Sequence, residues 1–262
     1  MKRKLGLVLG SGGARGVAHL GALKVLEENN IKPDIVVGCS MGSLVGGLYC
    51  TGHNLDELRD LLGQLTKKDI IDVSINMIKN RALLKSDKTD KFLRGFFQDK
   101  KIEDCEIPFG TVSVDLISGK EIYFTKGDFF TAVRASCSIP TIIKPVQYEN
   151  MLLVDGGLIN RVPTEFARNM GADKVIAVDV MHGVGQKRQI NNIFDVALRS
   201  IDVVDYYITK NRLESSPPDV LVLPKLKDMS PYKVEDLEFA YEQGYNAMQA
   251  NLKRIKALVN EL

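Results

Sequence analysis

The feature that most restricts the fold is a short apolar run that ends in a turn of very small residues. Ile35 to Val37 are β-branched and predict a buried strand, and a helical pattern resumes at Ser43. The turn between them is Gly38-x-Ser40-x-Gly42, the G-x-S-x-G pattern of a nucleophile elbow. Such a turn strains the serine backbone and pushes Oγ outward, and the strand and helix approach too closely for larger neighbours. Alone, this short pattern fits a turn without chemistry equally well.

The chain before this turn predicts a repeated strand–helix unit. Leu5 to Leu9 form an apolar strand, a glycine-rich loop follows, and Val17 to Asn29 carry a helical apolar pattern. With the elbow strand and its helix, the order is strand, helix, strand, helix. This order implies a parallel sheet with a right-handed crossover.

The glycine-rich loop has competing interpretations. A dinucleotide site needs G-x-G-x-x-G and an acidic residue after the second strand, but Arg15 occupies the third glycine position and no acid follows. A P-loop needs G-K-[ST], which is absent. Consecutive glycines also form oxyanion holes, because their main-chain N–H groups converge on one oxygen. Gly12 and Gly13 end the strand next to the Ser40 strand, which favours this use over a helix-capping turn.

The stretch from Leu55 to about Lys101 is predicted to be helical and is locally basic. Between residues 63 and 101 there are ten Lys or Arg and five Asp. Solvated helices packed on the sheet are the simpler interpretation. The alternative is a lid-like segment, at about 63–101, that touches an anionic lipid surface.

The second half of the chain continues with strands and helices and adds a carboxylate at a strand end. The predicted strands are 109–116 and 121–125 as a hairpin, then 152–154, 174–180 and 219–223. The predicted helices are 128–135, 193–213 and 232–262, the last with a kink at Gly244. Asp155-Gly156-Gly157 follows the strand 152–154 directly, so a carboxylate lies on a tight turn; an ordinary Asp-Gly turn has the same pattern.

Composition excludes several classes of protein. The net charge of +2 does not favour nucleic acid as a partner, and no window contains about 18 consecutive apolar residues. The basic start, Lys2 to Lys4, precedes only five apolar residues, which is too short for a signal peptide, so we expect a cytoplasmic protein. The four cysteines form no C-x-x-C pair, so neither disulfides nor a metal site is expected.

Four blocks of the sequence, in order, resemble the motifs of patatin-like phospholipases. The blocks are the glycine loop 10–16, the elbow 38–42, the small-residue stretch 135–140 and the Asp-Gly-Gly turn 155–157. No single block is specific for this family, but four blocks in the family's order are strong evidence for the resemblance. The resemblance spans residues 5 to about 180 and fades in the basic stretch and the C-terminal part. Ser11 stands where many members of the family have glycine.

The resemblance implies an α/β fold, three-layer α/β/α with a mostly parallel central sheet, in a single domain over residues 1–262. It implies a serine acyl hydrolase that cleaves carboxylic esters of lipids with a Ser40–Asp155 dyad and without a cofactor or metal. Its partners would be a lipid or acyl-ester substrate and transient contact with the inner membrane face. The resemblance places Gly12, Gly13 and Ala14 in the oxyanion hole. It implies supporting roles for Gly10, Ser11, Arg15, Gly16, Gly38, Gly42, Gly156 and Gly157.

Three alternatives remain open from the sequence. The order Ser40, Asp155, His182 is that of α/β-hydrolase triads, although only one strand precedes the elbow strand here. A nucleotide-binding module and a non-catalytic regulatory scaffold are the others. His19, just past the glycine loop, is interpreted as a packing residue rather than a base. The substrate and the oligomeric state do not follow from the sequence.

Overall fold

The computed structural model describes residues 3–64, 87–97, 99–182, 190–191, 193–226, 229–231 and 236–262. Within these residues one mixed sheet has the order β5-β6-β3-β2-β1-β7-β8, and β4 pairs with β3. The strands are β1 (Leu5–Leu9), β2 (Ile35–Gly38), β3 (Phe109–Asp115), β4 (Glu121–Phe124), β5 (Val146–Tyr148), β6 (Met151–Asp155), β7 (Lys174–Val178) and β8 (Val220–Val222).

The parallel strands all end at one edge of the sheet, which we call the carboxyl edge. β1 pairs in parallel with β2 and β7, β2 with β3, and β7 with β8. Leu9 lies opposite Gly38 on one side and Val178 on the other, so these three residues mark the carboxyl edge. β6 runs antiparallel to β3 and places Asp155 opposite Ser113, just past the level where Gly38 pairs with Thr111.

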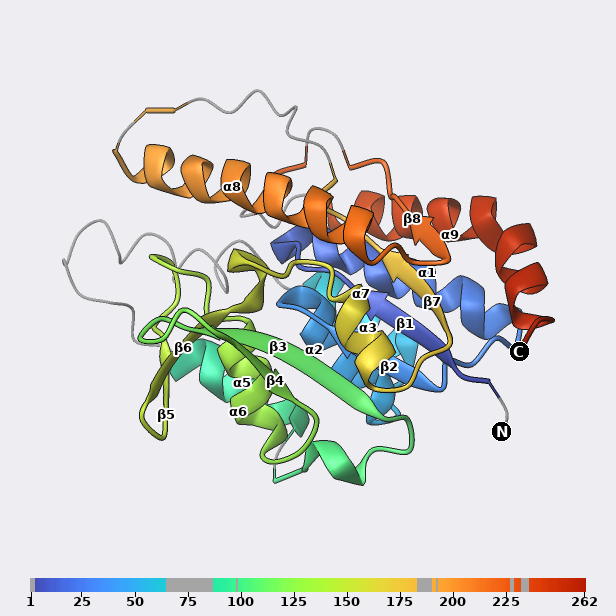
Figure 1. Cartoon of the computed structure of the whole chain (residues 1–262), viewed down its shortest axis with the longest axis horizontal. Helices are drawn as coiled ribbons and strands as arrows, with labels where there is room; N and C mark the ends of the chain where they lie inside the picture. Colours follow the sequence, from blue (N-terminus) through green and yellow to red (C-terminus); the bar gives the residue numbers. More distant parts are fainter. Residues whose placement is uncertain are drawn as a thin grey trace.

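Helices cover both faces of the sheet, which confirms the three-layer α/β/α fold expected from the sequence (Figure 1). One face carries α1 (Ala18–Glu28), α2 (Met41–Cys50), α3 (Leu55–Gln64), α5 (Asp87–Phe97), α6 (Phe129–Ser136) and α9 (Leu237–Val259). The other face carries α7 (Thr164–Asn169) and α8 (Ile193–Ser215). Short 3-10 turns are η1 (Gly13–Val17), η2 (Ile102–Asp104) and η3 (Gly156–Leu158).

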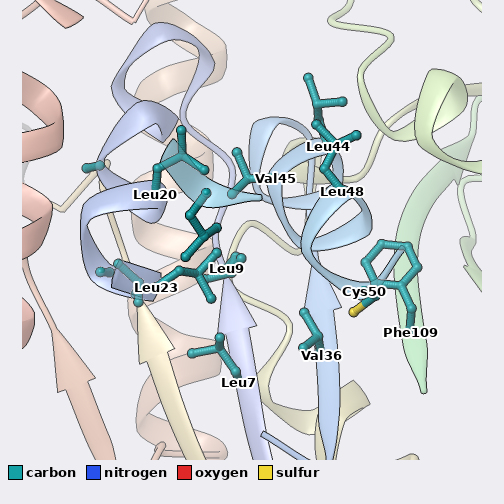
Figure 2. Packing of buried hydrophobic residues seen from close by; sticks show 14 of the residues in the cluster. Leu7, Leu9, Leu20, Leu23, Val36, Leu44, Val45, Leu48, Cys50 and Phe109 are labelled. Carbon is teal, nitrogen blue, oxygen red and sulfur yellow. The ribbon is translucent and has the colours of Figure 1, made fainter. Parts of the chain in front are cut away.

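The core divides in two because successive side chains of a strand point to opposite faces. Leu7 and Leu9 of β1 join the larger cluster, where α1 and α2 cover β1 and β2 (Figure 2). Val8 points the other way, into a smaller cluster with Phe166 of α7. The alternation on β1 therefore builds both layers from a single five-residue strand.

Most elements lie where the sequence predicts them. α9 continues without a break through Gly244, the position of the predicted kink. A Cβ at Gly244 would lie 1.8 Å from the carbonyl oxygen of Ala18, and one at Gly21 would lie 2.0 Å from that of Tyr241. These glycines let α1 and α9 pack backbone to backbone. β5 and α7 were not predicted.

Residues 65–86 and 98 of the basic segment lie outside the described residues, so its lid-like role is not tested. Its described part, α5, buries Leu93 and Phe97 in the larger cluster. Across the ranges that the structure describes, we find no helix that is both long enough and apolar enough to span a membrane.

The two ends of the chain lie side by side (Figure 1). Arg3 donates a hydrogen bond to the carbonyl oxygen of Glu261, and the Glu261 carboxylate pairs with Lys174 at 2.8 Å. Lys174 is the first residue of β7. Both termini are therefore at the edge of the sheet opposite the carboxyl edge.

Candidate active site

Ser40 occupies a strained turn between β2 and α2, as the sequence predicts. Its backbone angles are φ 53° and ψ −121°, a region that non-glycine residues rarely adopt. A Cβ at Gly38 would lie 2.4 Å from the Gly42 carbonyl oxygen, and one at Gly42 would lie 2.0 Å from that of Leu9. Both glycines are required because the strand and the helix nearly touch.

The Ser40 turn is held by the small residues at the C-terminal end of α6. The Ser40 N–H donates to Ser136 Oγ at 2.9 Å, and the Cys137 thiol donates to the Ser40 carbonyl at 3.3 Å. Ser40 is only 3% exposed, so the hydroxyl is not pushed out into solvent as the elbow pattern suggests. It faces a buried carboxylate instead.

That carboxylate belongs to Asp155, at the end of β6. Its Oδ1 accepts a hydrogen bond from the Gly157 N–H at 2.7 Å and one from the Cys39 thiol at 3.7 Å. Burial raises the pKa of Asp155 to about 6, while hydrogen bonds from Ser40 and Gly157 act in the opposite direction. The structure therefore brings Ser40 and Asp155 together, although 115 positions separate them in the chain.

The glycine loop supplies main-chain donors next to this pair. The N–H groups of Gly10 and Ser11 donate to Val178 and Arg161 carbonyls, each at 3.0 Å. Among the described residues, the N–H groups of Gly12 and Gly13 have no main-chain acceptor. Gly13 has φ +52°, a conformation that glycine adopts without strain.

Ala14, one of the predicted oxyanion donors, has an acceptor for its N–H within the protein. Its N–H donates to the carbonyl oxygen of Pro231 at 2.9 Å, so it is already satisfied. The sequence could not show this, because Pro231 is more than 200 positions away. Met41 is a candidate donor that the sequence analysis missed: nucleophile elbows use the N–H of the residue after the nucleophile, and the described residues offer the Met41 amide no main-chain acceptor.

Arg15 and His19 hold the loop from behind. The Arg15 Nε donates to the Met229 carbonyl at 2.8 Å, and the His19 ring bonds the Gly10 carbonyl through Nε2 at 2.7 Å. Burial lowers the pKa of His19 to about 4, so the ring is neutral at pH 7 and Nε2–H is the donor. Both residues brace the loop.

The other glycines of the motifs mark close approaches between the turns. A Cβ at Gly16 would lie 2.2 Å from the Met41 side chain, which links the glycine loop to the elbow helix. A Cβ at Gly156 would lie 2.4 Å from the Val112 carbonyl oxygen, and one at Gly157 would lie 2.9 Å from Ser11 Oγ. Ser11, the departure from the family pattern, therefore lies beside the Asp155 turn.

His182 lies past the end of β7, where its Nδ1 contacts the Asp179 main-chain oxygen at 3.1 Å. The side chains and N–H groups that bond the Asp155 carboxylate, within the described ranges, are Ser40, Cys39 and Gly157. No histidine is among them. This arrangement fits a dyad better than a triad.

A buried ion cluster lies behind the Asp155 turn and was not predicted. Arg161 Nη1 donates to Asp205 Oδ2 at 2.7 Å, and Nη2 lies 3.6 Å from Asp179 Oδ2. All three side chains are buried. The only signal in the sequence is that Arg161 follows the Asp-Gly-Gly turn by a few residues; nothing in the pattern of α8 indicates that Asp205 faces inward.

The described part of the chain contains no group of three or more His, Cys, Asp or Glu that could hold a metal ion. The site that these residues form is thus a hydroxyl, a carboxylate of raised pKa and a set of unpaired amides. Such a set can activate a serine and stabilise a developing oxyanion.

Comparison with known proteins gives matches over the same blocks. The family model described as patatin-like phospholipase matches residues 7–168. An uncharacterized NTE family protein of Mycobacterium tuberculosis is 35% identical over 177 residues, which is 68% of this chain and 49% of that protein. The neuropathy target esterase sws of Drosophila melanogaster is 33% identical over 184 residues, 67% of this chain and 13% of that protein.

The chain thus spans half or less of the length of these curated relatives. Among solved structures, VipD from Legionella pneumophila is similar with a TM-score of 0.56 and 12% identity, over 97% of this chain and 67% of that one. At this identity the likeness concerns the fold alone.

Proposed function

The chain belongs to the patatin-like phospholipase family, and from this we propose that it hydrolyses carboxylic esters of lipids with Ser40 as nucleophile and Asp155 as base. The observation that carries the proposal is the meeting of a strained serine and a buried carboxylate next to the glycine loop, where the N–H groups of Gly12 and Gly13 have no main-chain acceptor among the described residues. The family membership supports the proposed substrate class. The geometry supports the proposed roles of Ser40 and Asp155.

In the first half of the reaction, Asp155 accepts the Ser40 hydroxyl proton while Oγ bonds to the acyl carbon. The carbonyl oxygen becomes an oxyanion, which the N–H groups of Gly12 and Gly13 stabilise; one such donor is worth about 3 kcal/mol of barrier. The ester C–O bond then breaks, and the leaving alkoxide takes the proton from Asp155. Ser40 is left acylated.

In the second half, Asp155 takes a proton from water, whose oxygen attacks the acyl carbon. The Ser40–acyl bond breaks, Ser40 recovers its proton and the fatty acid leaves. A carboxyl group of pKa about 6 suits this role, because it is ionised at neutral pH yet is a stronger base than an exposed aspartate. Burial is the main cause of that value.

The decisive test compares Ser40→Ala, Asp155→Asn and His182→Ala with the unmodified protein on water-soluble acyl esters and on phospholipids. We expect the first two variants to lower kcat by about 10³-fold or more, and His182→Ala to change it by less than about threefold. Circular dichroism melting controls for folding.

Two outcomes contradict the proposal. Activity that survives Asp155→Asn but not His182→Ala assigns the site to a triad. A folded protein whose Ser40 fails to react with a fluorophosphonate probe, and which cleaves none of these esters, is a scaffold or a binding module.

A further inference from the structure

The solvent-facing side of α8 carries large apolar residues along its first four turns, with Ser200 between them. Exposed residues recur there at the three-to-four-residue spacing of one helix face, and the large ones are Ile193, Val196, Val204 and Tyr207. Ile193 is 83% exposed and Val204 is 56% exposed. Solvated helices normally place polar residues on this side. We call these four residues the outer stripe of α8.

Among the described side chains of α8, the fully buried ones are polar. Asp205 and Thr209 are both buried, Asp205 Oδ2 accepts from Arg161 at 2.7 Å, and Thr209 donates to Asp205 Oδ1 at 3.1 Å. Turning the outer stripe inward would remove Asp205 from Arg161 and leave a buried guanidinium without this partner. The ion pair therefore fixes the rotation of α8 and keeps the stripe outside.

The outer stripe extends beyond the carboxyl edge. Arg161 lies just after the Asp155 turn, and α8 packs on η3, so Asp205 marks the level of that turn. Ile193 precedes Asp205 by twelve residues, or about 18 Å along the helix. In Figure 1 the first turns of α8 extend past the ends of β1 and β7.

A second apolar projection lies at the same edge. The tip of the β3–β4 hairpin exposes Leu116 and Ile117, the latter to 69%. β3 is parallel to β2, so its end lies at the carboxyl edge together with the Ser40 turn. Two segments remote in sequence thus present large apolar side chains on the side of the molecule where the proposed nucleophile lies.

We propose that the outer stripe of α8 and the tip of the β3–β4 hairpin seat the protein on a lipid surface by apolar insertion. The inference rests on the proposed function, because it names the surface from which that site takes its substrate. Apolar side chains of an interfacial helix insert at the boundary of headgroups and acyl chains. Two separate projections at one edge suit such a soft, planar surface.

The geometry favours lipid over a second copy of the chain. A stable protein interface buries about 800 Å² on each partner with closely matched shapes. The outer stripe is one convex ridge, four side chains long, separate from the hairpin tip. A lipid surface accommodates a ridge without a matching groove.

The outer stripe contains no Lys or Arg, so docking does not require anionic lipid. This distinguishes the proposal from attraction of the basic segment to an anionic membrane. Binding to zwitterionic phosphatidylcholine vesicles is expected, with less than about a twofold change between 0.05 and 0.5 M salt, because screening acts on charges.

The test measures cosedimentation with phosphatidylcholine vesicles in a Ser40→Ala background, which keeps the lipid intact. Ile193→Asp/Val196→Asp should lower the partition coefficient at least tenfold, and Ile117→Asp should lower it to a smaller degree. The matched control, Asn211→Asp/Ser215→Asp, adds the same charge to exposed positions of α8 outside the stripe and should bind as the parent does.

With Ser40 restored, the stripe variant should lose vesicle hydrolysis in parallel while kcat/KM for a monomeric short-chain ester stays within about twofold. Loss of vesicle binding in the stripe variant alone supports the proposal. Binding that requires anionic lipid and disappears in salt overturns it, as does self-association through the stripe, measured by sedimentation equilibrium. Vesicle binding without hydrolysis of any ester leaves this proposal standing and defeats the proposed function.

Discussion

α8 and α9 are both 23 residues long, and each follows a parallel strand, yet they bury opposite kinds of residue. α9 buries apolar side chains such as Met248 and Ile255 against the larger core. α8 buries Asp205 and Thr209 and leaves Ile193 and Val204 in solvent. Length and apolar content are therefore not what decides which side of a helix faces the protein.

The surface that each helix meets makes the difference. α9 lies on α1, where Gly21 and Gly244 allow the two backbones to touch and apolar side chains to interlock. α8 lies over Arg161, a buried cation that requires a carboxylate nearby. α9 therefore buries apolar side chains on an apolar support, whereas α8 places the carboxylate of Asp205 over a buried cation.

The largest expected effect is on stability, when an aspartate is placed on each of the two helices in turn. Met248→Asp places an unpaired carboxylate in a fully buried position and should lower the free energy of unfolding by about 4 kcal/mol or more. Val204→Asp adds the same group to the outer stripe and should change it by less than about 0.5 kcal/mol. Urea denaturation measures both. A large loss from Val204→Asp would mean that the stripe is covered in solution.

The second effect concerns the cation under α8. Arg161→Met leaves Asp179 and Asp205 buried without their shared partner and should cost about 3–5 kcal/mol. In a hydrogen-exchange experiment, the backbone amides of α8 should lose protection, while the backbone amides of α9 should keep their protection.

Arg161→Met/Asp205→Leu should recover part of this loss, because it removes one of the unpaired carboxylates. Equal loss of protection in both helices would show that Arg161 supports the whole fold and not α8 in particular.

The smallest expected effect is a shift in the pH dependence of kcat/KM. It should follow from removal of a charge on α8 but not from removal of a charge on α9. Burial is the main cause of the raised pKa of Asp155, and the charge of Asp205 adds to it. Ionised Asp155 is the active form, so kcat/KM should rise with pH through about 6. Asp205→Asn removes a negative charge that opposes ionisation of Asp155. The pKa of Asp155 should therefore fall, and the rise of kcat/KM should move to lower pH.

The matched variant on α9 is Glu238→Gln, which removes an exposed charge from the same type of helix and should leave the profile unchanged. A profile of Asp205→Asn that stays in place, or moves to higher pH, would contradict the coupling of α8 to Asp155.

The sequence was sufficient for the fold and for most of the site because those features depend on local rules. The β1 and β2 strands, the Ser40 elbow and the Asp155 turn follow from short apolar runs that end at glycine-containing turns. Close backbone approach explains why positions 38, 42 and 156 are glycine, and that requirement is visible in the sequence.

Contacts between distant segments account for what the sequence missed. Ala14 gives its N–H to Pro231, and Ser136 receives the N–H of Ser40; no local pattern encodes either bond. The inward position of Asp205 has the same origin, since its partner Arg161 is 44 positions earlier. Helical periodicity identifies α8 as a helix, but it does not show that Asp205 is one of its buried residues.

The adjacent chain ends, at the edge opposite Ser40, determine how the protein can be tethered. A carrier domain or a solid support attached close to Arg3 or Leu262 would lie on the side of the molecule away from Ser40. The edge with the Ser40 turn, the hairpin tip and the first turns of α8 would then face outward. Immobilised in this way, the protein would keep its reactive side free to meet a bilayer brought to it.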